Sequence, residues 1–433
     1  MTRTWIAVTG MLVLAGCSGG GGSDPAPVSS QSVAPQPQPP PSARPTIEPD
    51  MLTATPQGLL RGKASGQGQH LIFAHPNLHR EQLFMSQDLV YYPRYNTPPF
   101  VATSDADVWS VGTDGTGDHA ILNSRLDEFV VGTNGPFAMV TLFTYSEAGL
   151  EQVDHGTLRA GQPLIRFPIT IPFMDFQVMT GTQGYFYTPL QIVAANLDGS
   201  GVLTLVNMPT PVTTDTQFIA PPLVVVGSTL LFRENDALGR FASLQSIPVS
   251  GGAVTALDDG RHYNVYAAHV GDRVVSQICR VDPTSFRAGP CDVDGVNADG
   301  SGLAVLASDP ANEAVQGIIG TQAIVRRNLS GNDHLIAVPV AGGPERLLMT
   351  MTDSEFVQLV TSDLLIVRRP SGTWTLDLNG TLKQIGNVQA DSGFIVVGNA
   401  LCANKGTAVW CMPLDGQGQA VKIADTGDRK SVV

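Results

Sequence analysis

The sequence predicts an all-β protein: a β-propeller of four-stranded antiparallel blades, preceded by a disordered N-terminal tether. Glycine and proline are frequent, with 46 and 31 residues among 433. Turns rich in Asp, Asn and Gly recur along the chain, and short apolar strands of alternating pattern lie between them. After the N-terminal leader we find no convincing amphipathic helix. A period of roughly 40–50 residues that contains several short strands is the signature of a propeller.

Composition excludes several classes of protein. The abundance of glycine and proline excludes a coiled coil or helical bundle, which needs long stretches of charged helix formers. The chain has 25 Lys and Arg against 38 Asp and Glu, a net charge of −13. We therefore expect no nucleic-acid partner, because an acidic surface repels a polyanion. A hydrophobic content of 42% supports a sizeable core and excludes disorder of the whole chain.

The first 17 residues predict a lipoprotein signal peptide. Arg3 gives a positive start, and Trp5 to Leu14 is an apolar run too short to span a bilayer. Residues 14–17, Leu-Ala-Gly-Cys, resemble the lipobox of bacterial lipoproteins. The resemblance implies cleavage before Cys17, a diacylglycerol on its sulfur and an acyl chain such as palmitate on its new amine. An ordinary secretory signal with a chance cysteine is the alternative. Ser18, in place of Asp, indicates the outer membrane rather than the inner one.

Residues 18–50 predict a disordered tether between the lipid and the body of the protein. The segment contains four consecutive glycines and the run QPQPPP, and it has almost no apolar side chains to bury. Its Gly-rich part should be a flexible coil and its Pro-rich part semi-extended. A Pro-rich ligand for a partner domain is the alternative use of this segment.

Residues 51–433 form the predicted propeller domain. One turn in each unit serves as a marker, at Asp114, Asp154, Asp198, Ser250, Asp299, Ala341, Asn379 and Asp415. The mean spacing of about 43 residues suits four short strands in each unit. The markers predict eight blades; the Asp154 turn is the weakest match, and seven blades are the alternative. Leu59 to Lys63 is a candidate strand for the last blade at the closure of the ring. A β-sandwich, which has no reason for so long a period, is the alternative fold.

The cysteines predict two disulfides. Apart from Cys17, the chain has Cys279, Cys291, Cys402 and Cys411. An even number in an exported chain indicates disulfides, and four cysteines allow three pairings. The first two lie on the second and third predicted strands of one blade, and the last two lie on the same strands of the final blade. Each pair can therefore face across one hairpin, at a separation that a disulfide accepts.

One element of the sequence resembles a known kind of repeat. An apolar strand, the turn Asn-x-Asp-Gly-Ser-Gly and a second apolar strand occur at Ile192 to Val206 and at Val293 to Leu306, with a looser copy at Val108 to Leu122. This element resembles the WD-type repeats of periplasmic TolB-like β-propellers and the YWTD-type propellers in which DGSG ends a blade hairpin. The YWTD tetrapeptide is absent. The resemblance covers most of residues 108–424 and implies a propeller in the cell envelope, without a specific function.

The sequence offers no catalytic or metal-binding motif. It contains no G-x-S-x-G elbow, no Walker A motif and no H-E-x-x-H, so the catalytic residues stay unknown and no cofactor is expected. The turns at residues 196–201 and 297–302 partly resemble calcium loops. Their twelfth positions are Asn207 and Ser308, where such a loop needs an acid. We therefore predict no metal site.

Two arginine pairs are the candidate binding residues. Arg326-Arg327 and Arg368-Arg369 occur at matching places near the ends of second strands. In an acidic protein such pairs could face an anionic ligand or partner. Alternatively, one arginine of each pair points to solvent and the other pairs with an acid. The aromatic segments at Tyr91–Tyr95 and Tyr185–Tyr187 suit an interface, a sugar-stacking surface or a blade core equally well.

These observations predict a membrane-anchored envelope lipoprotein whose propeller is a protein-binding or scaffold module. Its expected partners are envelope proteins, and the lipid on Cys17 would join it to the membrane. No small-molecule or glycan ligand is identified by the sequence. The alternative is an envelope enzyme that degrades a polysaccharide or peptide at the propeller channel. An exposed apolar patch on one rim would favour the binding module, and a cluster of His, acids and Arg at the channel mouth would favour the enzyme.

Overall fold

The computed structural model describes residues 50–425, apart from 56, 75–82, 87, 96–105, 125, 147–148, 160, 172–176, 188–190, 208–222, 236–241, 259–261, 282–287, 309–311, 330–331 and 390–391. The predicted signal peptide, with Cys17, and the tether up to residue 49 lie outside the described residues. Every regular element in the described part is a β-strand, which confirms the all-β prediction. In that part of the chain we find no helix with the length and apolar character needed to cross a membrane.

The strands of the described residues group into nine units, numbered here as blades 1 to 9 in chain order: blade 1 has three strands, and each of the other eight has four antiparallel strands. Blades 2 and 3 are joined into one eight-stranded sheet, as are blades 5 and 6, and the other blades are separate sheets. Blade 1 consists of β1 (Asp50–Thr55), β2 (Gly58–Lys63) and β3 (His70–Ala74). Blade 2 consists of β4 (Phe84–Ser86), β5 (Leu89–Tyr95), β6 (Ala106–Gly112) and β7 (His119–Leu122). Blade 3 consists of β8 (Asp127–Asn134), β9 (Phe137–Ser146), β10 (Gly149–Arg159) and β11 (Ile165–Ile171). Blade 4 consists of β12 (Gln177–Thr180), β13 (Gln183–Tyr187), β14 (Gln191–Asn196) and β15 (Leu203–Asn207).

The remaining blades follow the same plan. Blade 5 consists of β16 (Val224–Val226), β17 (Thr229–Asn235), β18 (Ala242–Pro248) and β19 (Thr255–Ala256). Blade 6 consists of β20 (His262–Val270), β21 (Arg273–Val281), β22 (Ala288–Asn297) and β23 (Ala304–Ala307). Blade 7 consists of β24 (Asn312–Ile319), β25 (Gln322–Leu329), β26 (Asn332–Pro339) and β27 (Arg346–Met351). Blade 8 consists of β28 (Phe356–Val360), β29 (Leu365–Arg369), β30 (Gly372–Leu376) and β31 (Leu382–Gly386). Blade 9 consists of β32 (Ser392–Val397), β33 (Ala400–Lys405), β34 (Ala408–Pro413) and β35 (Val421–Asp425). One parallel residue pair joins blade 2 to blade 3, and another joins blade 5 to blade 6.

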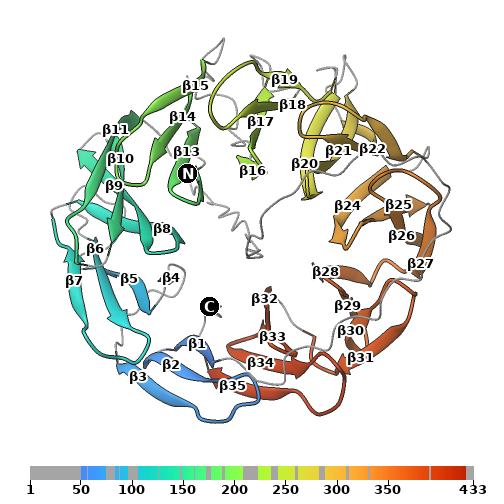
Figure 1. The fold of residues 1–433 in the computed structure, drawn as a ribbon. Helices are drawn as coiled ribbons and strands as arrows, with labels where there is room; N and C mark the ends of the chain where they lie inside the picture. Colours follow the sequence, from blue (N-terminus) through green and yellow to red (C-terminus); the bar gives the residue numbers. More distant parts are fainter. Residues whose placement is uncertain are drawn as a thin grey trace, which may run out of the picture. The chain divides into compact units, whose positions relative to one another are not determined.

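Within residues 43–433, the blades follow one another in chain order around a ring (Figure 1). In the four-stranded blades the first strand lies innermost, as β24, β28 and β32 do, and the last lies outermost, as β27 and β31 do (Figure 1). A four-stranded sheet cannot bury both of its faces alone, and radial packing covers them. This arrangement confirms the predicted propeller.

The hydrophobic core is divided among the contacts between neighbouring blades. Leu365 of β29 belongs to a cluster with Ile324 of blade 7. The next residue, Ile366, belongs to a different cluster with Leu401 and Met412 of blade 9. Successive side chains of a strand point to opposite faces, so each blade supplies one half of its buried side chains to each neighbour.

Blade 1 closes the ring between blades 9 and 2. On one face, Met51 shares a cluster with Val409 and Ile423 of blade 9. On the other face, Leu52 shares a cluster with Tyr92 of blade 2. Side-chain packing on both faces of blade 1 therefore completes the ring.

This closure differs from the one that the sequence suggested. The candidate strand Leu59–Lys63 lies in β2, which pairs with β1 and β3 of its own blade, and blade 9 has four strands from residues 392–425. The predicted number of eight is correct for the four-stranded blades, and the alternative of seven is wrong. Blade 1 was not counted, so the prediction is one blade short for the ring.

The turn of blade 1 carries a signal that could have revealed it. Residues 65–68, Ser-Gly-Gln-Gly, match residues 114–117, Asp-Gly-Thr-Gly, of blade 2. In both turns the backbone N–H of the first glycine donates to the carbonyl oxygen three residues earlier. The distances are 2.9 Å from Gly66 to Lys63 and 2.8 Å from Gly115 to Gly112. The blade 1 turn has the spacing Gly-x-Gly of the blade 2 turn, with Ser65 in the place of Asp114.

One marker turn is wrong. Asp154 to Gly156 lies inside β10, where the pairing with β11 shifts register. The turn between these two strands contains Gly161 instead, with φ +70°. Asp and Gly suit a β-bulge as well as a turn, because both tolerate irregular backbone conformations.

Turn glycines also fit the blades together. Gly115 has φ +84°, and a Cβ placed on it would lie 2.0 Å from the carbonyl oxygen of Ile72 in blade 1. Gly66 of blade 1 has φ +82°, and its Cβ would lie 2.9 Å from Cγ1 of Val421 in blade 9. Only glycine combines this backbone conformation with so close an approach. The same contact is therefore made at an ordinary blade junction and at the closure of the ring.

We expect Gly115→Ala to destabilise the protein more than Gly117→Ala does. Both glycines have positive φ, +84° and +71°, so each substitution costs about 1–2 kcal/mol in backbone conformation. A Cβ on Gly117 would meet nothing within 4 Å, whereas a Cβ on Gly115 clashes with blade 1. We expect a further loss of about 2 kcal/mol for Gly115→Ala, measured by urea unfolding. Equal losses would contradict the close contact between the blades.

Candidate functional site

Arg327, one of the four predicted binding arginines, is buried in an ion-pair cluster of blade 7. Its Nε donates to Glu313 Oε1 at 2.7 Å. Its two terminal nitrogens donate to the two carboxylate oxygens of Glu345 at 2.9 and 2.7 Å. The hydrogen bond to Glu345, followed by that to Glu313, raises the pKa of the Arg327 guanidinium, against the opposing effect of burial. Glu313 itself is fully buried, so this ion pair belongs to the interior.

Two of the other arginines also pair with acids. Arg369 pairs with the buried Glu355, and Arg326 pairs with the buried Asp333. Glu313 lies near the start of the innermost strand β24, and Glu355 directly precedes the innermost strand β28. The pairs of Arg327 and Arg369 therefore tie the start of an innermost strand to the end of the second strand in two consecutive blades.

Arg368 differs from these three. Its Nη2 donates to the amide oxygen of Gln389 at 3.4 Å, and its guanidinium carbon lies 5.9 Å from the centroid of the Phe356 ring. Its partners among the described residues are thus a neutral amide and an aromatic ring. Binding of an anion by these arginines stays a prediction. Arg368 is the best candidate of the four, because its described partners are neutral.

A hollow of about 700 Å³ lies next to Arg368, between blades 8 and 9. Turns and strand ends of both blades line it: Pro370, Asn387, Gln389, Lys405, Gly406, Thr407, Ala408, Trp410, Lys422 and Asp425. Pro370 belongs to the turn between β29 and β30; Lys405 ends β33, and Gly406 and Thr407 form the equivalent turn of blade 9. No sequence motif marks this site, because its residues come from separate turns and strand ends of two blades.

The polar groups of the hollow are partly held in place. Gln389 Nε2 donates to the carbonyl oxygens of Pro370 at 2.7 Å and Arg369 at 3.3 Å. Lys422 Nζ lies 2.6 Å from a carboxylate oxygen of Asp425. Trp410 is half-buried and packs on the core shared by blades 8 and 9. The hollow thus presents ammonium, amide and indole groups on a supported surface.

The aromatic segments that the sequence left open belong to the core. Tyr91, Tyr92, Tyr185, Phe186 and Tyr187 are all at most 2% exposed. Burial raises the pKa of Tyr187 to about 12, so its hydroxyl stays neutral at physiological pH. These side chains fill the spaces between blades and offer no surface for stacking.

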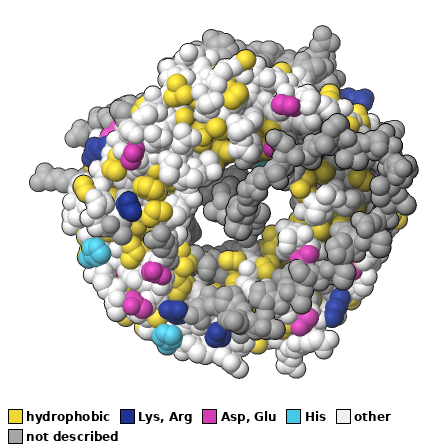
Figure 2. Space-filling model, viewed as in Figure 1, with side chains coloured by type: hydrophobic (Ala, Val, Ile, Leu, Met, Phe, Trp, Pro, Cys, Tyr) yellow, Lys and Arg dark blue, Asp and Glu magenta, His cyan; other side chains and the backbone are white. Residues whose placement is uncertain are grey.

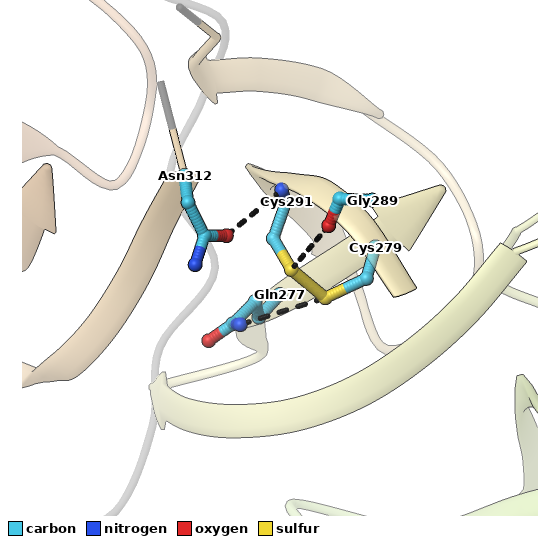
Figure 3. Close-up of a disulfide and its surroundings, with 5 residues drawn as sticks. All are labelled: Gln277, Cys279, Gly289, Cys291 and Asn312. Atoms are coloured by element: carbon cyan, nitrogen blue, oxygen red, sulfur yellow. Dashed lines mark hydrogen bonds between the residues drawn. A yellow bond between two sulfur atoms is a disulfide. The ribbon is translucent and has the colours of Figure 1, made fainter. Parts of the chain in front are cut away.

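The predicted disulfides are present. Cys279 of β21 is bonded to Cys291 of β22, and Cys402 of β33 to Cys411 of β34. In each case the two residues are direct partners across the hairpin. Figure 3 shows the first disulfide beside Asn312, whose side-chain oxygen accepts the backbone N–H of Cys291 at 3.1 Å. The bond thus lies where blade 6 meets the first strand of blade 7.

The calcium-like turns use their carboxylates for the turn itself. Asp198 Oδ1 accepts the Ser200 hydroxyl at 2.6 Å and its backbone N–H at 2.9 Å. These two hydrogen bonds lower the pKa of Asp198, and Ser301 does the same for Asp299. Across the described ranges, no group of three or more His, Cys, Asp or Glu side chains is placed to hold a metal ion.

Exposed aliphatic side chains lie at or beside the outermost strands of four consecutive blades. We call this surface the apolar rim; it consists of Val202 and Leu203 of blade 4, Val254 of blade 5, Leu303 and Val305 of blade 6, and Leu347 of blade 7. These side chains are 43–62% exposed. At one junction a rim residue meets the next blade, since a Cβ on Gly251 of blade 5 would lie 3.6 Å from Leu203 Cδ2 of blade 4.

The apolar rim carries a sequence signal that the analysis overlooked. In blades 4, 5 and 6 an aliphatic residue follows the last turn glycine by one or two positions, as in Gly201-Val202-Leu203, Gly252-Ala253-Val254 and Gly302-Leu303.

On the face in Figure 2, the coloured charged side chains of both signs lie mainly toward the outer part, and hydrophobic ones gather nearer the middle. Charge of neither sign dominates the described part of that face.

Known proteins resemble this chain in fold. No protein-family model and no curated protein matches the sequence. A solved structure of a eukaryotic initiation factor has a TM-score of 0.59 at 8% identity, over 89% of this chain and 98% of that one. The β-propeller domain of the trilobed protease from Pyrococcus furiosus has a TM-score of 0.40 at 7% identity, over 81% and 99%. A prolyl endopeptidase has a TM-score of 0.43 at 11% identity, over 78% and 53%. At these identities the likeness concerns the fold alone.

We expect Arg327→Gln to destabilise the protein by about 3–5 kcal/mol, because it leaves the buried carboxylate of Glu313 without its cation. Arg280→Gln is the matched control: Arg280 Nη2 lies 3.4 Å from Asp292, and its side chain is 66% exposed. An exposed pair contributes about 1 kcal/mol or less. Urea unfolding measures both losses. If Arg327→Gln costs no more than Arg280→Gln, the buried ion pair does not hold the strands together.

Proposed function

We propose that this chain is a lipid-anchored protein of the bacterial cell envelope whose propeller binds a partner protein. The lipobox-like residues Leu14 to Cys17 and the Gly- and Pro-rich segment after them support the anchor and its spacer. Ser18, which follows the lipidated cysteine, directs the proposal to the outer membrane. The propeller lies beyond that spacer in the chain.

The apolar rim carries the proposed binding role. The rim repeats exposed aliphatic side chains at the outermost strands of four consecutive blades, and exposed apolar surface of this kind marks interaction sites. Leu347 of the rim stands beside the exposed Arg346 and Glu345. A mixture of aliphatic side chains with arginine suits a protein interface, whereas insertion of both charges into a bilayer would be costly. The occupant we propose is therefore a partner protein.

The alternative function, an envelope enzyme that degrades a polysaccharide or peptide, has less support. The described residues that line the hollow between blades 8 and 9 include Asp425 but no histidine. In blades 7 and 8, Arg327 is paired with Glu313 and Glu345, and Arg369 is paired with Glu355. An interaction role therefore accounts for more of the exposed features.

We expect Cys17→Ala to abolish lipidation. Expressed with labelled palmitate in a Gram-negative bacterium, the natural chain should incorporate the label and sediment with the outer membrane. The variant should lose the label and the membrane association, because Cys17 supplies the only acceptor sulfur in the lipobox. Retention of the label by Cys17→Ala would overturn the proposed anchor.

We expect the partner to crosslink to the apolar rim. A photoreactive amino acid at Leu303 of the full chain, expressed in its own host, should give a discrete crosslinked product. Introducing Val305→Asp should reduce that product at least about fivefold, because a carboxylate in an apolar interface is left unpaired. Met85 and Val131, at 39% and 38% exposure, lie outside the rim.

These two residues are the controls for the rim. The photoreactive group at Met85 should give no such product, and Val131→Asp should leave the product from position 303 unchanged. A product of equal yield from both positions, or one insensitive to Val305→Asp, would exclude the rim as the binding surface.

A further inference from the structure

We propose that the hollow between blades 8 and 9 binds an anionic saccharide. The hollow has a volume of about 700 Å³, within the range of roughly 300–1,000 Å³ that is typical of small-ligand sites. It lies between the turns of two neighbouring blades, which the core holds in position. Its lining groups indicate the class of ligand.

Positive charge is concentrated in this hollow. The chain has only five lysines, at positions 63, 383, 405, 422 and 430, and Lys405 and Lys422 both line it. Lys422 is paired with Asp425, but Lys405 has no carboxylate partner among the described residues. Arg368 adds a guanidinium behind Gln389. In a chain of net charge −13, such a local excess of cations favours an anionic group.

Trp410 supplies an apolar platform beside these cations. Trp410 is half-buried; it packs against the core shared by blades 8 and 9 and also lines the hollow. A large aromatic surface fixed beside polar groups suits a ligand that combines an apolar face with hydrogen-bonding groups. The C–H face of a sugar ring has this character.

The remaining lining groups suit sugar hydroxyls. Asn387 and Thr407 provide an amide and a hydroxyl, which can both donate and accept hydrogen bonds, and the amide oxygen of Gln389 retains acceptor capacity. Gln389 is fixed by the carbonyl groups of Pro370 and Arg369, so little side-chain entropy remains to be lost on binding. An acidic peptide would use the cations but not the combination of indole and amides, and we therefore assign the hollow to a saccharide with a carboxylate, sulfate or phosphate group.

This inference is independent of the proposed partner at the apolar rim. The rim lies on blades 4 to 7, and the hollow lies between blades 8 and 9. Variants of one surface should leave binding at the other surface unchanged. Each proposal can therefore fail in its own experiment without affecting the result for the other.

The test is binding of the full chain, purified in detergent, to an array of defined oligosaccharides. The array carries members with uronate, sulfate or phosphate groups, each beside its neutral counterpart. We expect retention of acidic members only, with an affinity that falls as ionic strength rises. Lys405→Gln should weaken binding of the best acidic member at least about tenfold, since a charge-assisted contact is lost. Trp410→Ala should abolish it.

Lys383→Gln is the matched control, because Lys383 lies on β31 of blade 8 but does not line the hollow. It should leave the affinity within about twofold of the natural chain. Near-ultraviolet circular dichroism checks that each variant is folded; Lys405 is exposed, so its replacement should not disturb the core. The proposal is overturned if no acidic saccharide is retained, if neutral counterparts bind equally, if Lys405→Gln behaves like Lys383→Gln, or if an acidic peptide of equal charge binds more tightly.

Discussion

The structure depends on one constraint: each sheet must have both of its faces covered by its neighbours. Adjacent residues of a single strand, such as Leu365 and Ile366, contribute to two different clusters. A sheet at the end of an open row would leave one of these faces in water. Blade 1 removes that exposed face although it has three strands among the described residues, because Met51 packs toward blade 9 and Leu52 toward blade 2. Among residues 50–425, as far as the structure describes them, the ring therefore closes by side-chain packing and without a strand shared between its two ends.

Polar contacts at the strand ends make this packed frame a support for binding surfaces. The pairs of Arg327 with Glu313 and Arg369 with Glu355 attach innermost strands to their neighbours. The Cys402–Cys411 disulfide ties together the two strands of blade 9 on either side of the turn at Gly406 and Thr407. The hollow thus lies between segments whose ends are held on both sides. Preorganisation of this kind reduces the entropy lost when a ligand binds.

The repeat, the four-stranded plan and the disulfide pairing could be predicted because each depends on residues close in sequence. Tight turns require Gly, Asn or Asp within a few positions, and cysteines across one hairpin meet by strand pairing alone. The same locality explains the errors. Asp154 and Gly156 look like a turn but lie at a bulge, and the blade 1 turn at Ser65 was not counted although its Gly-x-Gly spacing matches that of blade 2. The tyrosines at positions 91 and 185 suit a core and a surface equally well until their neighbours are known.

By itself, the sequence determined the strand pattern, the turn positions of most blades and the partners of Cys279 and Cys402. Local backbone preferences and cross-hairpin pairing specify these features over about a dozen residues or fewer. Only the tertiary structure decided how the ring closes, which arginines are neutralised by acids, and which aliphatic side chains remain exposed on the outermost strands. It also decided that Trp410 shares a hollow with residues of blade 8. These outcomes join separate blades or separate strands of one blade, so their physical cause is the packing of whole sheets rather than any local motif.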